Sequence, residues 1–159
     1  MAENSNETTM EFTEEDFYRG AVVPRVNSLF YILEDILPGA DVDQQIGDNG
    51  LPFVRVSIDD EVIDLKYFAV GEPDEGRYIL LLQSTVFEFE NDDKGYVMEC
   101  AGFNFGSAFG YAVYDPVNMT VELRAQTPEA EGILPRAHYE NLIALFLYGI
   151  SELRNSIEG

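Results

Sequence analysis

The sequence has 159 residues, a length that fits one domain able to bury roughly 70% of its unfolded surface. Hydrophobic residues make up 46% of the chain and aromatic residues 13%, which excludes wholesale disorder. Thirty acidic residues against nine basic ones give a formal net charge of −21, and a field of that sign repels nucleic-acid phosphates and anionic lipid. We therefore expect neither nucleic acid nor a membrane as a partner.

Cysteine content and the first residues bear on the cellular compartment. The single cysteine, Cys100, rules out an internal disulfide and a cysteine-rich zinc site. No apolar run approaches the ~20 residues that a membrane-spanning helix needs. The first twelve residues are polar and acidic, unlike the basic and then apolar design of a signal peptide. A cytoplasmic protein is expected.

The domain organisation is read from the first part of the chain. Residues 1–19 are expected to form an acidic N-terminal tail, and residues 20–159 a single α+β domain. Within the tail, Thr13 followed by three acidic residues is typical of a capped helix start, and it allows a short helix through Arg19.

The first long helix is predicted to begin after Pro24 and to end at Pro38-Gly39. Between these limits the apolar residues recur every three or four positions and form one stripe: Val26, Leu29, Phe30, Leu33, Ile36 and Leu37.

Three strands are predicted next. The polar stretch 41–50 is interpreted as a loop, whereas residues 53–58 and 62–69 are rich in β-branched and aromatic residues and flank Asp59-Asp60. This arrangement predicts a hairpin. The nearly continuous apolar run 78–89 predicts a central strand that is buried on both faces.

The second half predicts a short helix over 96–105, a strand over 109–114 and a turn over 115–118. Residues 119–126 alternate strictly between apolar and polar, which is typical of a half-buried strand, and a loop is expected over 127–132. The final helix opens at Pro135. The order is α-β-β-β-α-β-β-α, and the short connections imply an antiparallel sheet of about five strands flanked by helices.

No motif in the chain indicates a catalytic or metal-binding function. His138 is the only histidine, which is too few for a typical catalytic zinc site, and Cys100 lies in an apolar stretch that favours an inert buried thiol. Most clustered carboxylates fall on turn signals and are expected to be solvated. We therefore expect no enzyme, no catalytic residue, no cofactor and no metal site.

The apolar residues of the final helix extend beyond what one sheet usually needs. Large apolar patches on the surface of a domain usually mark interaction sites. Three residues at or beyond the edges of their helix stripes are the candidates for a protein interface: Phe30, Leu145 and Tyr148.

The segment FNFGSAFGYAVY, residues 103–114, resembles the short-helix-to-strand passage of YbjN-like proteins, often labelled bacterial sensory transduction regulators. The turn, the alternating strand and the final helix follow in the same order, and the helix from Pro24 to Leu37 also matches. The resemblance covers about residues 22–157. That family is similar in fold to the class I chaperones of type III secretion.

The resemblance implies a twisted antiparallel sheet flanked by helices, often assembled as a dimer, and an activity of holding or regulating another protein. It supplies no catalytic motif. The leading hypothesis is thus a non-enzymatic protein-binding module, chaperone-like or regulatory, with a protein client and with a homodimer left open. The alternative is a small-ligand sensor with an apolar pocket between the last helix and the sheet. A third hypothesis is an acid–base enzyme that uses paired carboxylates.

Overall fold

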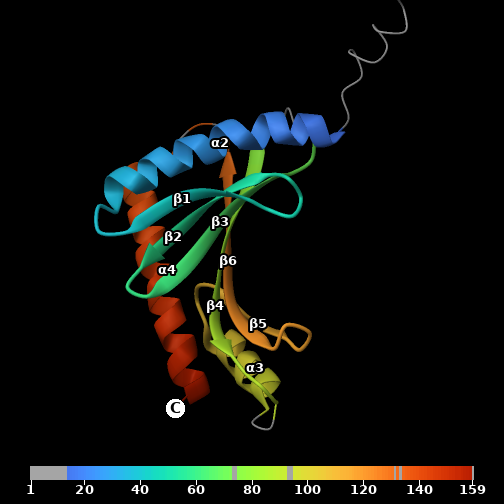
Figure 1. Cartoon of the computed structure of the whole chain (residues 1–159), viewed down its shortest axis with the longest axis vertical. Coiled ribbons are helices and arrows are strands. Elements are labelled where there is room, and N and C mark those ends of the chain that lie inside the picture. The colour runs from blue at the N-terminus through green and yellow to red at the C-terminus, as the bar shows by residue number, and fades with distance from the viewer. Residues whose placement is uncertain (1–13, 73–74, 93–94, 131, 133, 159) are drawn as a thin grey trace, which may run out of the picture.

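The computed structural model describes residues 14–72, 75–92, 95–130, 132 and 134–158. The elements in this part of the chain follow in the order α2 (Glu14–Ile36), β1 (Asp41–Ile46), β2 (Pro52–Ile58), β3 (Glu61–Ala69), β4 (Arg77–Glu88), α3 (Tyr96–Gly106), β5 (Tyr111–Asp115), β6 (Thr120–Ala130) and α4 (Arg136–Glu158) (Figure 1).

The strands form one antiparallel sheet in the order β1-β2-β3-β4-β6-β5, so the predicted α+β class is confirmed. The described sheet has six strands, slightly more than the five expected. β4 pairs with both β3 and β6, and Leu80, Leu81 and Leu82 are buried in succession, as predicted for a central strand. The predicted hairpin is also present, with Asp59 and Asp60 in the left-handed conformation that a two-residue turn requires.

One face of the sheet carries the core. Because paired residues share a face, Val54, Leu65, Leu82 and Ala125 form a buried row across four strands. α2 crosses one end of the sheet and α4 runs along its length (Figure 1). The opposite face carries polar cross-strand pairs, such as the ion pair of Arg55 with Asp64.

The first helix does not begin after Pro24 as predicted; α2 already includes Glu14 and continues through the proline. A proline inside a helix lacks a backbone donor and costs about 3 kcal/mol. Val22 and Val26 on either side of it are fully buried, so packing onto the sheet offsets that cost. The tail boundary proposed after residue 19 falls within α2 and stays a prediction, and Thr13 lies outside the described residues.

The interpretation of residues 41–50 as a loop was wrong, because β1 occupies Asp41–Ile46. The strand lies at the edge of the sheet and none of its residues is buried. Backbone pairing with β2 holds this strand in place. Because no side chain of the strand has to be buried, its sequence shows no alternation of apolar and polar residues.

β6 is also longer than predicted and runs on through Pro128 to Ala130. β5 pairs with β6 only as far as Arg124, so no strand among the described residues flanks the remainder of β6 on that side. A proline is tolerated there because it breaks no ladder hydrogen bond on the free side. The extension matters for the interior, because it carries the buried Glu129.

Among the described helices, none combines the length and the apolar character that crossing a membrane would require.

Candidate protein-binding surface

α3 is attached to β5 by polar contacts at both of its ends. Asp92 accepts hydrogen bonds from the Tyr96 backbone N–H (2.9 Å) and the Tyr114 hydroxyl (2.6 Å). These bonds, the one from Tyr114 above all, lower the pKa of Asp92. At the other end the Asn104 side chain accepts from the N–H of Ala112 and donates to its C=O. The Asn104 amide thus occupies the backbone donor and acceptor of Ala112, so these groups are not free to pair with another strand at the sheet edge.

The inner side of α3 is small and aromatic. Its buried residues are Tyr96 and Cys100, and the Tyr96 ring lies 5.0 Å from that of Phe89, which stacks on Tyr114 at 5.7 Å. Burial raises the pKa of the Cys100 thiol, and the negative charge of Glu99 acts in the same direction. Both effects keep the thiol protonated, which fits an inert core cysteine.

The outer side of α3 is apolar and faces solvent. Val97 is 49% exposed, Met98 73% and Phe105 97%. Met98 and Phe105 are seven residues apart and therefore share one face of the helix. A domain rarely leaves such side chains uncovered together unless they contact a partner.

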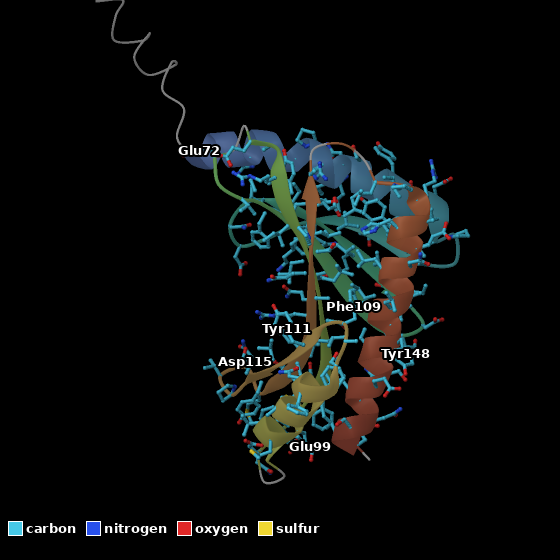
Figure 2. All side chains as sticks on the ribbon, turned by 180° about the vertical axis from the view of Figure 1, so that it is seen from behind. Glu72, Glu99, Phe109, Tyr111, Asp115 and Tyr148 are labelled. Carbon is cyan, nitrogen blue, oxygen red and sulfur yellow. The ribbon has the colours of Figure 1, made fainter. Side chains whose placement is uncertain are left out.

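A groove of about 470 Å³ lies between α3 and α4, and we call it the α3–α4 groove. Tyr148 on α4 and Phe109 on the loop after α3 both line it, and Figure 2 labels the two residues. Added Cβ atoms at Gly102 and Gly106 would meet nothing within 4 Å, so the missing side chains keep the groove open on the α3 side. Its lining consists mainly of small and apolar residues: Gly102, Phe103, Gly106, Ser107, Ala108, Phe109, Leu145, Tyr148, Gly149, Glu152 and Ser156.

Two of the three predicted interface residues come together here. Leu145 is 49% exposed and Tyr148 65% exposed, and both line the α3–α4 groove. Phe30 is not part of it. That residue lies on α2, half-buried against the core, with its ring edge-on to Tyr31 at 5.4 Å. Whether these side chains contact a partner stays a prediction.

The sequence analysis did not identify Phe105 as a surface residue or Phe109 as part of the groove lining. The available signal was the pair Gly102 and Gly106, four residues apart on one side of a helix. Two glycines at this spacing leave one side of the helix without side chains, which indicates a groove on that side.

A second cavity, of about 320 Å³, lies between α2 and the sheet and is lined by three tyrosines: Tyr67, Tyr78 and Tyr139. Arg25 from α2 also lines it, with its guanidinium 4.2 Å from the ring centre of Tyr78 and 5.2 Å from that of Tyr67. These distances are within the range of cation–π attraction.

Arg25 is paired with Glu129, whose side chain is fully buried. One carboxylate oxygen, Oε1, accepts hydrogen bonds from Arg25 (2.8 Å), the Tyr67 hydroxyl (2.8 Å) and the Tyr139 hydroxyl (3.2 Å). Burial and, after it, the negative charge of Glu129 raise the pKa of Tyr67 well above its ordinary value. Burial raises the pKa of Tyr139 as well. The tyrosines therefore remain neutral donors to the carboxylate.

No protein-family description matches this sequence, and no curated protein matches it either. Solved structures do. A chain of the crystal structure of the ExsC–ExsE complex has a TM-score of 0.52 and 16% identity over 82% of this chain and 93% of its own. YbjN from E. coli, described as a candidate transcription regulator, has a TM-score of 0.52 and 14% identity over 84% of this chain and 90% of its own.

At such identities these likenesses show the fold. The YbjN-like fold predicted from the sequence is confirmed.

Proposed function

We propose that this chain is a cytoplasmic, non-catalytic module that binds a protein client, in a chaperone-like or regulatory role, through α3 and the α3–α4 groove. The observation that carries the proposal is the set of uncovered apolar side chains on neighbouring elements, Met98 and Phe105 on α3 and Leu145 and Tyr148 on α4. The shared fold with a chain from a complex of two proteins supports a protein partner.

The test compares two tyrosines that are equally exposed but differently placed. Tyr148 is 65% exposed in the α3–α4 groove and Tyr31 is 67% exposed on α2. Immobilised wild type, Tyr148→Ala and Tyr31→Ala are incubated with native cell extract, and captured proteins are identified by mass spectrometry. We expect a client that binds wild type and Tyr31→Ala but is lost with Tyr148→Ala.

A client retained by all three proteins would move the interface away from α4, and a client lost only with Tyr31→Ala would place it on α2. The same surface can also be covered by a second copy of the chain. Sedimentation velocity of the purified protein tests this, because a homodimer would have twice the monomer mass of 17.9 kDa. A dimer that dissociates on Phe105→Ser would identify the second copy as the occupant of the apolar surface.

The tyrosine-lined cavity between α2 and the sheet favours the second candidate, a small-ligand sensor. A preformed, largely apolar cavity with a few polar groups is typical of ligand sites. The sequence predicted a pocket between the last helix and the sheet, whereas this cavity lies between α2 and the sheet. The last helix contributes Tyr139 to its lining. A thermal-shift screen of planar aromatic compounds tests this function: a true ligand raises the melting temperature of wild type and Tyr148→Ala, but not of Tyr78→Leu.

A further inference from the structure

The sheet divides on one side of its central strand. β3 pairs with β4 from Ala69↔Tyr78 only as far as Asp64↔Gln83. β3 nevertheless continues along β2 to Glu61, and β4 continues along β6 to Glu88, with an irregularity in register after Thr85. The ends of β3 and β4 thus separate, and we call this place the β3–β4 fork.

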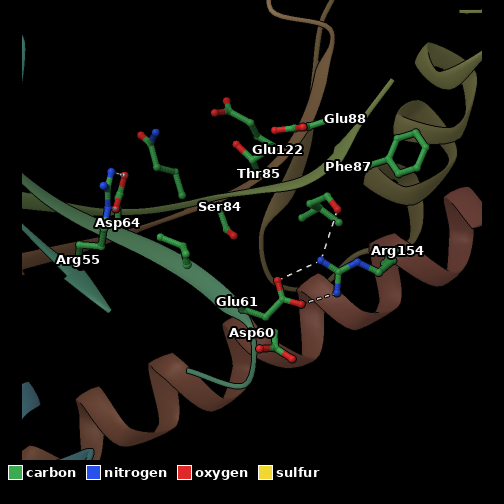
Figure 3. A pocket seen from close by; sticks show the side chains of 13 residues that line it. Arg55, Asp60, Glu61, Asp64, Ser84, Thr85, Phe87, Glu88, Glu122 and Arg154 are labelled. Carbon is green, nitrogen blue, oxygen red and sulfur yellow. Dashed lines mark hydrogen bonds and ion pairs between the residues drawn. The ribbon is translucent and has the colours of Figure 1, made fainter. Parts of the chain in front are cut away.

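A cavity of about 410 Å³ occupies the β3–β4 fork (Figure 3). Its charged lining is dominated by carboxylates, five against two guanidinium groups: Asp60, Glu61, Asp64, Glu88 and Glu122. Several of these were expected from the sequence to lie on solvated turns. The fold instead gathers them around one hollow, together with the apolar side chains of Val62, Val86 and Phe87.

The two arginines of the cavity are already engaged. Arg154 from α4 holds both oxygens of Glu61 and also donates to the C=O of Val86 at 3.3 Å. Arg55 holds both oxygens of Asp64, at 2.8 and 3.1 Å. The cavity retains an excess of negative charge after this pairing, since Asp60 and Glu88 have no ion pair within the described chain.

Ser84 provides an observation independent of the charge. Ser84 is only 4% exposed, and its hydroxyl oxygen has no hydrogen-bond partner among the described residues. The side chain projects into the cavity in the fork (Figure 3). A buried hydroxyl without a partner costs about 1–3 kcal/mol, so a group that bonds to it on binding gains this contribution.

We propose that the cavity in the β3–β4 fork binds a primary alkylammonium group, supplied either by a free polyamine or by a lysine side chain. The ammonium donates to Ser84 Oγ on the side of β4 that faces Asp60 and Glu61, while its alkyl chain lies against Val62 and Phe87 (Figure 3). Glu88 lies on the opposite face of β4, together with Glu122, and attracts the cation only through the negative potential of the cavity. Long amines commonly bury their methylene stems in this way while the charge meets polar groups.

The arrangement selects ammonium over the other cations. A guanidinium needs a carboxylate that can accept two parallel bonds, and the nearby Glu61 and Asp64 already have such partners. An ammonium is compact and can direct single bonds to separate acceptors. A metal ion is disfavoured because no group of three or more potential ligands is gathered for one in the part of the chain described.

The test is calorimetric titration of the full chain with spermidine and, separately, with a short neutral peptide that contains one lysine. Saturable one-to-one binding of either probe is expected, and the tighter of the two identifies the source of the amine. Acetylation of the peptide lysine should abolish its binding. 1,5-Pentanediol, which lacks the charge, should not bind.

Ser84→Ala separates a binding role from a structural one. Removing an unsatisfied buried hydroxyl should leave the unfolding midpoint in urea unchanged or raised, whereas amine affinity should fall about tenfold with the lost charge-assisted bond. An unchanged or higher unfolding midpoint together with weaker amine binding supports the proposal. Unchanged affinity in Ser84→Ala overturns it.

Glu88→Gln and Glu72→Gln form a matched pair, because each removes one negative charge from an exposed position. Only Glu88 lines the cavity; Glu72 lies on a turn elsewhere. We expect Glu88→Gln to weaken binding about threefold and Glu72→Gln to leave it unchanged. Equal weakening by both would show diffuse attraction to an acidic protein and would overturn the site, as would the absence of saturable binding by both probes.

Discussion

Single residues far apart in the sequence hold α2 onto the sheet. Arg25 and Glu129 are separated by 104 positions, and the arginine also donates to the C=O of Ala130 at the end of β6. The pair is buried, with 13% of the arginine and none of the glutamate side chain exposed. A buried pair contributes little by comparison with a well-packed apolar pair, but the loss of one partner leaves the other charge uncompensated.

We predict that Glu129→Ala lowers the free energy of unfolding by about 3–5 kcal/mol, because Arg25 then lies buried without its counter-charge. Urea denaturation followed by circular dichroism measures this change. Glu140→Ala, at an exposed position of α4, is the control and should have little effect. The double variant Arg25→Met/Glu129→Leu should recover most of the loss, and failure of that recovery would contradict the assignment of the cost to an unpaired charge.

The raised pKa of Tyr67 predicts that the stability of the folded protein depends on pH in the alkaline range. Its pKa is raised in the folded state, chiefly by burial and then by Glu129, so the folded protein keeps a proton that the unfolded chain loses. The contribution is fully present below the ordinary tyrosine pKa of about 10 and declines as the pH rises above it. Tyr67→Phe should flatten the fall of the urea midpoint above about pH 10. Parallel curves for the two proteins would show that Tyr67 is not responsible.

At the scale of elements, α3 and α4 contain glycines with opposite roles. Gly102 on α3 borders the α3–α4 groove, and an added Cβ there would meet nothing within 4 Å. Gly149 on α4 is buried, and its added Cβ would lie 2.9 Å from Cδ2 of Leu123. The first glycine leaves space for a groove, whereas the second allows the helix to approach the sheet closely.

The two glycines give a matched pair of alanine variants. Gly102→Ala should raise the free energy of unfolding by about 0.5–1 kcal/mol, since alanine favours the helix and nothing obstructs it. Gly149→Ala gains the same propensity but should lower the free energy of unfolding by about 1–3 kcal/mol through overpacking against Leu123. Urea unfolding of both variants under one set of conditions provides the measurement. Equal shifts in the same direction would contradict the packing argument.

At the scale of the whole molecule, the charge of −21 acts against compactness. The described ion pairs, such as those of Arg25, Arg55 and Arg154, neutralise only a fraction of the carboxylates. The remaining like charges repel one another in the folded state more than in the expanded unfolded chain. Added salt screens this repulsion.

We therefore predict that the melting temperature rises as NaCl is increased from about 0.01 M to about 0.3 M, over which the screening length falls from about 30 Å to below 10 Å. Differential scanning calorimetry measures the change, with sucrose at matched osmolality as the control for solvent effects. A melting temperature that falls steadily with salt would mean that the attractive ion pairs outweigh the repulsion.

The periodic, buried elements of this protein could be read from the sequence alone. Three segments pack against one core, and each shows the apolar pattern that burial requires. They are the run 78–89, the alternating stretch 119–126 and the final helix with its apolar stripe. The passage at residues 103–114, with the order of elements around it over about residues 22–157, indicated the YbjN-like fold. The sequence also placed Leu145 and Tyr148 outside their stripe, and both are exposed.

Other features depended on the tertiary structure because they arise from pairing between distant segments. β1 is an edge strand held by β2 and needs no apolar pattern, and α2 passes through Pro24 because the sheet buries the valines on either side. The contact of Glu129 with Arg25, and the meeting of Ser84 with carboxylates in the β3–β4 fork, depend on strand register and on where strands diverge. Local propensity sets the elements, whereas the free energy of bringing them together decides which polar groups become neighbours.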